Sequence, residues 1–110
     1  MAIIKQDYGS IGGGIDYSTF FNNLTYASQS GNNINYTFTV DKIYFIAYSR
    51  GSGVTDFGVT SGADVLSSGV TTISTGATSS YLMYFAIIKA TSATIAIKGT
   101  SNNVAISQLD

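Results

Sequence analysis

Few side chains in this sequence could carry chemistry. The chain has no His and no Cys, its six acidic residues are all Asp, and Ser and Thr make up about a quarter of it. General bases, metal ligands and covalent nucleophiles are mostly His, Cys, Glu and activated hydroxyls. Here such chemistry could rest only on Asp, Lys, Arg, Tyr and unactivated hydroxyls. We therefore expect a protein that is not an enzyme, holds no metal or other cofactor, and acts through shape and contact.

The carboxylates with the best claim to a site are Asp56 and Asp64, which lie in or near predicted loops. Together with backbone carbonyls they could bind Ca²⁺, but no Glu is present to bind it with two oxygens and no cluster has the spacing of a calcium loop. Two Asp could also form the carboxylate pair of a glycoside hydrolase, yet no spacing singles out a pair. We interpret both residues as surface Asp that cap turns, and we assign no catalytic or metal-binding residue.

Four glycines fall within residues 9–14. Their spacing matches neither the dinucleotide-binding nor the phosphate-loop pattern. So many glycines cost too much backbone entropy to lie inside a regular element. We predict a flexible N-terminal arm over residues 1–14, with an apolar segment at residues 2–4 that docks on a neighbouring subunit or a larger assembly, and one domain over residues 15–110.

Charge and hydropathy limit the partners. The formal net charge is −1, and the basic side chains are scattered along the chain. A nucleic-acid-binding face needs a cluster of such residues, so we expect no nucleic-acid partner. The longest apolar stretch, at residues 81–88, is far shorter than the roughly 20 residues of a membrane-spanning helix, so we expect no membrane insertion. The basic residues are Lys5, Lys42, Arg50, Lys89 and Lys98.

From residue 24 onward, apolar and polar residues alternate with period 2 between clusters of Gly, Asn and Ser, a pattern typical of strands. Residues 15–23 fit neither template and are left irregular. We predict an all-β fold, a single β-sandwich of jelly-roll type with seven to nine short antiparallel strands. The predicted strands cover residues 24–29 and 34–40, joined as a hairpin, and residues 43–49, 54–59, 64–66, 70–74, 81–88, 93–98 and 104–109.

Two of these strands, residues 43–49 and 81–88, are apolar or aromatic on both faces. In a two-layer sandwich only one face of a strand meets the core, so the arm or another subunit must cover the second face. We favour a subunit interface, because Tyr is common at interfaces. The candidate interface residues are Tyr44, Ile46, Tyr48, Leu82 and Tyr84, and the expected assembly is a homo-oligomer, with a trimer favoured.

Tyrosines near Asn, Asp and Ser are also compatible with a sugar-binding surface, because an aromatic ring stacks on the apolar side of a sugar. Candidates in this sense are Tyr8, Tyr17, Tyr26 and Tyr48. Packing in the core or at a subunit contact is the favoured interpretation of each.

The opening MAIIKQDYGSIGGG (residues 1–14) resembles the start of many short proteins of tailed phages and prophages of Gram-positive bacteria. The rest, with YTFTV at 36–40, GADVL at 62–66 and NVAISQL at 103–109, is similar to the compact jelly rolls of virion appendages and to trimeric tumour-necrosis-factor-like heads.

This resemblance implies a structural role in a tail, baseplate or fibre, which could face the host receptor. It also implies a location in the virion after synthesis in the host cytoplasm, and a trimer that contacts other virion proteins. A host surface glycan is a further candidate partner. A capsid decoration protein and a carbohydrate-binding module are the alternatives.

Overall fold

The computed structural model describes residues 24–50, 53–74 and 80–110, and these form strands, turns and loops without a helix. The predicted arm and residues 15–23 lie outside this described part. Nine strands are present in it, which confirms the all-β prediction. They are β1 (Thr25–Ala27), β2 (Gln29–Ser30), β3 (Asn33–Ile34), β4 (Ile43–Arg50), β5 (Gly58–Ser61), β6 (Ala63–Ser74), β7 (Ser80–Ala90), β8 (Ala96–Lys98) and β9 (Thr100–Gln108).

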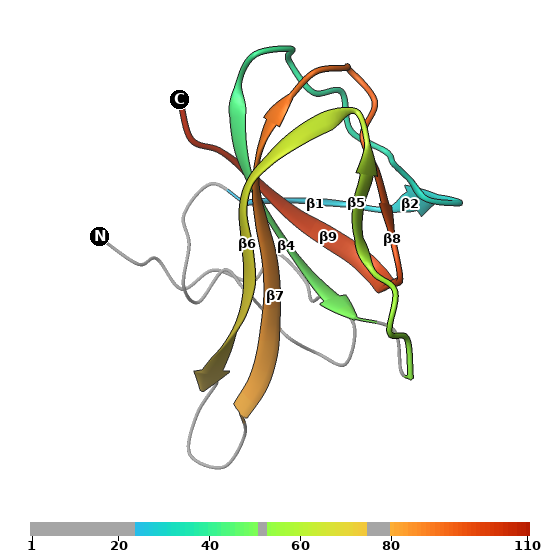
Figure 1. Cartoon of the computed structure of the whole chain (residues 1–110), viewed down its shortest axis with the longest axis vertical. Coiled ribbons are helices and arrows are strands. Elements are labelled where there is room, and N and C mark those ends of the chain that lie inside the picture. The colour runs from blue at the N-terminus through green and yellow to red at the C-terminus, as the bar shows by residue number, and fades with distance from the viewer. Residues whose placement is uncertain (1–23, 51–52, 75–79) are drawn as a thin grey trace.

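The strands form two antiparallel sheets that face each other as a β-sandwich (Figure 1). One sheet has five strands in the order β1-β9-β4-β7-β6, and the other has four in the order β2-β3-β8-β5. The sandwich is therefore confirmed, while its jelly-roll form stays a prediction. Strands β6, β7 and β9 are longer than the short strands that the sequence pattern predicts.

Two glycines turn the chain from one sheet into the other. Gly62 alone separates β5 from β6, and Gly99 alone separates β8 from β9. Both have positive φ, 87° and 74°, which favours glycine. Space also requires glycine, because a Cβ at Gly62 would lie 2.2 Å from the carbonyl oxygen of Thr94. Such corners, where one strand passes between sheets, are typical of steeply crossed sandwiches.

The hydrophobic core fills the space between the sheets. On β4, Tyr44, Ile46 and Tyr48 face inward, and the first two pair with Ile88 and Ala86 on β7. Burial of this kind stabilises a fold by about 1.5–3 kcal/mol for each large side chain. The largest fully buried side chains are Tyr44, Phe38, Ile46, Ile88, Ile95, Ile97, Ile106 and Val104.

The opposite face of β4 is buried as well. Phe45 and Ala47 point away from the core cluster, yet Phe45 is nearly buried and Ala47 is fully buried. The Phe45 ring stacks on Phe85 of β7, with ring centroids 6.0 Å apart. Residues 43–49 thus have both faces buried within one chain, and their strand lies in the middle of its sheet, between β9 and β7.

The segment predicted as a strand over residues 34–40 is only partly one. Regular pairing ends at Ile34, and the following residues form turns, held by bonds such as that from the Phe38 N–H to the Ala93 carbonyl at 2.9 Å. The predicted apolar face is still correct for Ile34, Tyr36 and Phe38, which are buried or half-buried, but Val40 is exposed. Alternation thus reports which side chains are buried without requiring a hydrogen-bonded ladder.

Candidate functional site

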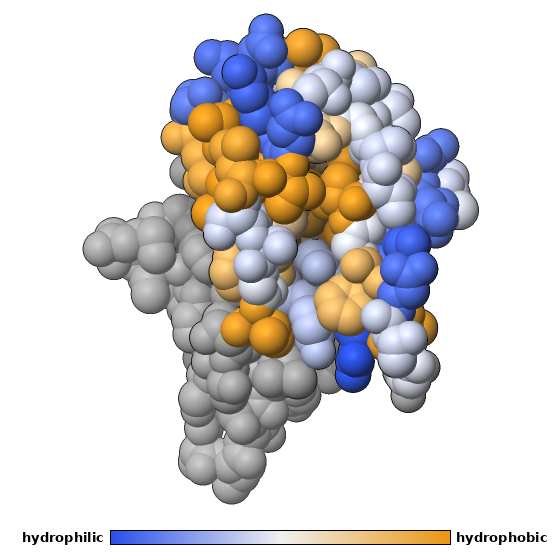
Figure 2. All heavy atoms as spheres, viewed as in Figure 1, coloured by the Kyte–Doolittle hydropathy of each residue, from blue (hydrophilic) through white to orange (hydrophobic). Residues whose placement is uncertain are grey.

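The side of the sandwich between β5 and β6 holds a cavity of about 340 Å³. Both strands are the last of their sheets, so the two layers are not joined by backbone pairing on this side. Figure 2 shows apolar surface over β6 and a hollow between β6 and β5. The residues that line it are Tyr48, Phe57, Gly58, Val59, Val65, Ser68, Gly69, Val70, Tyr84 and Ala86.

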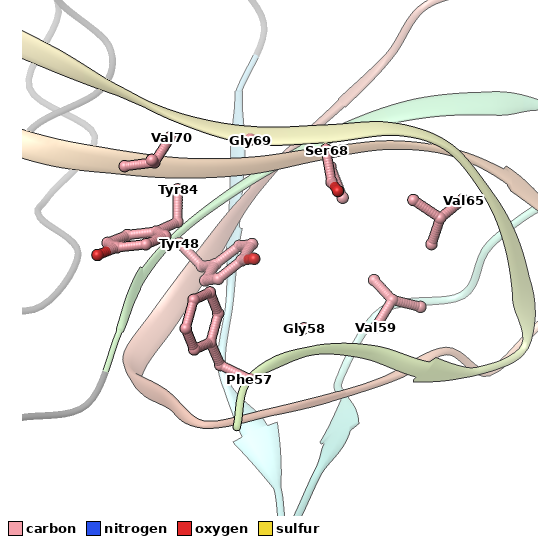
Figure 3. Close-up of a pocket in the computed structure, with 10 residues that line it drawn as sticks. Tyr48, Phe57, Gly58, Val59, Val65, Ser68, Gly69, Val70 and Tyr84 are labelled. Atoms are coloured by element: carbon pink, nitrogen blue, oxygen red, sulfur yellow. The ribbon is translucent and has the colours of Figure 1, made fainter. Parts of the chain in front are cut away.

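The two ends of the cavity differ in chemistry (Figure 3). Tyr48, Phe57 and Tyr84 gather at one end, and Val59 and Val65 face each other at the other. The only polar side chains among the lining residues are the hydroxyls of Tyr48, Ser68 and Tyr84. The cavity can therefore contact apolar groups and exchange a few hydrogen bonds, as small-molecule pockets do.

The aromatic end is a closely packed cluster. The Tyr84 ring stacks on Tyr48 at 5.9 Å and meets Phe57 edge-on at 5.2 Å between centroids. The Arg50 guanidinium carbon lies 5.7 Å from the centroids of both Phe57 and Tyr84. This distance fits a cation–π contact, so one positive charge lies against the cluster.

Burial changes the acidity of one phenol in this cluster. The pKa of Tyr48 is raised above its usual value, mainly because burial disfavours the charged phenolate and secondly because Tyr84 lies close. The hydroxyl therefore stays protonated at neutral pH. A protonated phenol can donate a hydrogen bond.

The sequence-based Asp candidates do not contribute to the cavity lining. Asp56 forms an exposed ion pair with Lys98, at 2.6 Å between oxygen and nitrogen. Asp64 is exposed on β6, and its backbone lies opposite Lys89 of β7 in the strand register. Among residues 24–50, 53–74 and 80–110, no three acidic residues are grouped in a way that could hold a metal ion.

Strand β6 forms the rim of the cavity and has an unusual surface for an outer strand. It runs over 12 residues, and from residue 65 to residue 74 it contains no charged residue. Val65, Leu66 and Val70 are 47%, 55% and 50% exposed. Natural sheets protect exposed edges with charges, Pro, very short strands or bulges, and this stretch has only the register shift between Val65 and Ser67.

The far half of β6 and the start of β7 pair only with each other among the described strands. The pairing of β4 with β7 ends at Tyr84, whereas that of β6 with β7 continues from Val70 and Tyr84 to Ser74 and Ser80. Figure 1 shows the two strands running on together beyond the rest of the sheet. A two-stranded ribbon is marginally stable by itself in water, so a further contact would stabilise it.

The structure changes the assignment of the predicted interface residues. Tyr44, Ile46 and Tyr48 are 1%, 0% and 4% exposed within a single chain, so they belong to its core and are not available to a partner. Tyr84 is half-buried and lines the cavity. Leu82 lies in the ribbon, and its side chain is outside the description.

Sequence reasoning missed β6 as the candidate interface. The lack of charge over residues 65–74 does not single out this strand, because residues 17–40 are also uncharged and the chain contains no Pro. Residues 67–69, Ser-Ser-Gly, also fall between the strands predicted over residues 64–66 and 70–74. In the structure these residues lie within one strand, next to a register shift between Val65 and Ser67.

No protein-family description, curated protein or solved structure matches this chain. In the described part of the chain, no helix is long and apolar enough to cross a membrane.

Proposed function

We propose that this protein is a non-enzymatic structural subunit that associates through the open side of its sandwich. The observation that carries the proposal is the outer edge of β6, which has no strand partner in the described part of the chain and lies beside half-exposed Val65, Leu66 and Val70. A strand or apolar surface placed there would satisfy the backbone groups and bury these side chains together. The low net charge is compatible with this, because self-repulsion between copies is weak.

The more specific role is that of a phage or prophage subunit in a tail, baseplate or fibre, with a capsid decoration protein as the alternative. This part rests on the resemblance of residues 1–14 and of the β-domain to such proteins. A structural role fits a cavity whose lining offers hydroxyls and apolar groups but no carboxylate.

The assembly is tested by light scattering on the purified chain at micromolar concentration. We expect a mass above that of the monomer, and a monomer would contradict the proposal. The virion role is tested by mass spectrometry of particles purified from a host strain that carries the gene. Absence of the chain from complete particles would contradict that role.

Carbohydrate binding is the second candidate function, and the aromatic end of the cavity favours it. Aromatic rings with nearby hydroxyls and an Arg are groups that bind sugars. Binding to a glycan array that is lost in a Ser68→Leu variant, whose side chain would fill the cavity, would support this function. Unchanged binding in the variant would place a sugar site elsewhere.

A further inference from the structure

We propose that β6 pairs in antiparallel fashion with β6 of a second copy, across a two-fold axis perpendicular to the sheet. The inference rests on the proposed function and specifies its contact. Such pairing would join the two five-stranded sheets into one continuous sheet. In this arrangement the partner at the open side of the sandwich is a second copy of this chain.

Length selects β6 among the sheet edges. The end strands of the two sheets are β1 and β6, and β2 and β5. Strands β1, β2 and β5 have 3, 2 and 4 residues, whereas β6 has 12. Among the end strands of the described part, only β6 offers a ladder long enough to hold two copies by main-chain hydrogen bonds.

The composition of β6 suits pairing with itself. A two-fold axis places each residue opposite one that lies equally far from the axis, so charges on the strand would meet like charges. Like charges directly opposite each other destabilise a sheet. Residues 65–74 carry no charge, so no register within this stretch brings like charges together. The nearest charged residue, Asp64, lies before the register shift at Val65 and Ser67.

The same axis also places the core-facing sides of the two sheets on the same side of the joined sheet. Strand pairing identifies the inward side of β6. Ser68 lies opposite Ala86, a core residue, and Val70 lies opposite Tyr84, which packs against the core. An axis perpendicular to the sheet keeps both cores on the same side of the joined sheet. Val65 and Val70, about half exposed in one chain, would then lie beside the inward side chains of the other copy, and the two cavities would adjoin.

These constraints point to a register centred on Val70. The irregularity at residue 66 limits regular pairing on one side. With the axis at Val70, residues 67–73 of one copy pair with residues 73–67 of the other, and residue 66 lies outside this ladder. Val70 then lies opposite Val70 of the second copy. Directly opposite residues in antiparallel strands have Cα atoms about 4.5–5.5 Å apart, and a disulfide spans Cα atoms about 4.4–6.8 Å apart.

This geometry gives a direct test in a protein that has no native Cys. In Val70→Cys, incubation with oxidised glutathione should form an intermolecular disulfide, the two thiols losing two electrons and two protons as the glutathione disulfide is reduced. We expect a covalent dimer on a non-reducing gel. Val40→Cys is the control, because Val40 is 48% exposed but lies outside β6, and it should stay a monomer on the same gel. Equal cross-linking in both variants, or none at Val70, would overturn the register.

The contact itself is tested by Val70→Lys and its control Val40→Lys in light scattering, with circular dichroism to confirm that both remain folded. The wild type and Val40→Lys should have the dimer mass, and Val70→Lys should have the monomer mass, because the ammonium groups would face each other across the axis. A folded Val70→Lys dimer would contradict the β6 contact. A wild-type trimer would also contradict this contact but would still support the proposed assembly function. A wild-type monomer would overturn both.

Discussion

The aromatic residues show how burial is matched by hydrogen bonding. Tyr44 is fully buried, yet its hydroxyl oxygen accepts a hydrogen bond from the Thr39 N–H at 2.8 Å. Its ring meets Phe38 edge-on at 5.0 Å, and Tyr36 tilts against Phe38 at 4.7 Å. The pKa of Tyr36 is raised, first by burial and then by the nearby Tyr44. These tyrosines therefore act as core residues with a polar end, and their enrichment did not require a partner subunit.

The raised phenol pKa values predict a loss of stability in alkali. A Tyr whose pKa is higher in the folded state than its ordinary value of about 10 holds its proton more tightly when folded. The resulting stabilisation is complete below about pH 10 and is lost as the pH rises through the higher folded pKa. We expect the melting temperature to fall between pH 9 and pH 11 (about one unit on either side of the ordinary pKa) less steeply in Tyr48→Phe than in the wild type. Equal slopes would contradict the assigned role of Tyr48.

A second prediction concerns the corner at Gly62. In Gly62→Ala the new Cβ would meet the Thr94 carbonyl oxygen, in addition to the strain of positive φ. We expect a loss of about 3 kcal/mol in the free energy of unfolding, measured in urea. Gly53→Ala is the matched control, because Gly53 also has positive φ but its added Cβ would meet no atom within 4 Å. It should lose only about 1 kcal/mol, and similar losses in both variants would contradict the steric argument.

At the scale of the elements, the sequence pattern predicted the fold class and most strands. It failed where the local composition is compatible with two different structures. Residues 24–29 look like one strand, but the chain leaves one sheet at Ser28 and enters the other as β2. A strand that is apolar on both faces can be covered within its own chain or by a partner, and only the burial of Phe45 and Ala47 shows that β4 is covered within its own chain. The candidate site depends on the strand order, so it could not be predicted from spacing alone.

Neighbouring residues on β7 test which face of the five-stranded sheet is the core. Ile88 is fully buried in the core cluster, whereas Ile87 lies on the opposite face and is partly exposed. We expect Ile88→Ala to cost about 2–5 kcal/mol of the free energy of unfolding and Ile87→Ala clearly less, as measured by chemical denaturation. The two variants remove the same atoms from adjacent positions, so each is the control of the other. A larger loss at Ile87 would show that the two faces are assigned the wrong way round.

At the scale of the whole molecule, the chain crosses between the two sheets at three points, and one of these joins β5 to β6, the two strands that border the cavity. The chain continues from β1 into β2 through Ser28, from β5 into β6 through Gly62, and from β8 into β9 through Gly99. Between β5 and β6 the layers separate around the cavity, and the exposed apolar residues of β6 lie along its rim. Among the described end strands, β6 is thus the one best suited to association.

The last prediction concerns the arm, residues 1–14, which lie outside the described part. The described residues of the buried cluster between the two sheets run from Ala27 to Ile106. Removing the arm would leave all of these residues in the chain. We expect a variant that begins at Ile15 to keep the far-ultraviolet spectrum, the cooperative melting and the dimer mass of the full chain, because β6 is intact. The same variant should be absent from assembled particles, because it lacks the apolar segment at residues 2–4. A short apolar segment followed by glycines is suited to docking on a neighbouring protein. If the shortened chain instead fails to fold, Ile3 and Ile4 belong to an integral strand of the sandwich, and the division into arm and domain is wrong.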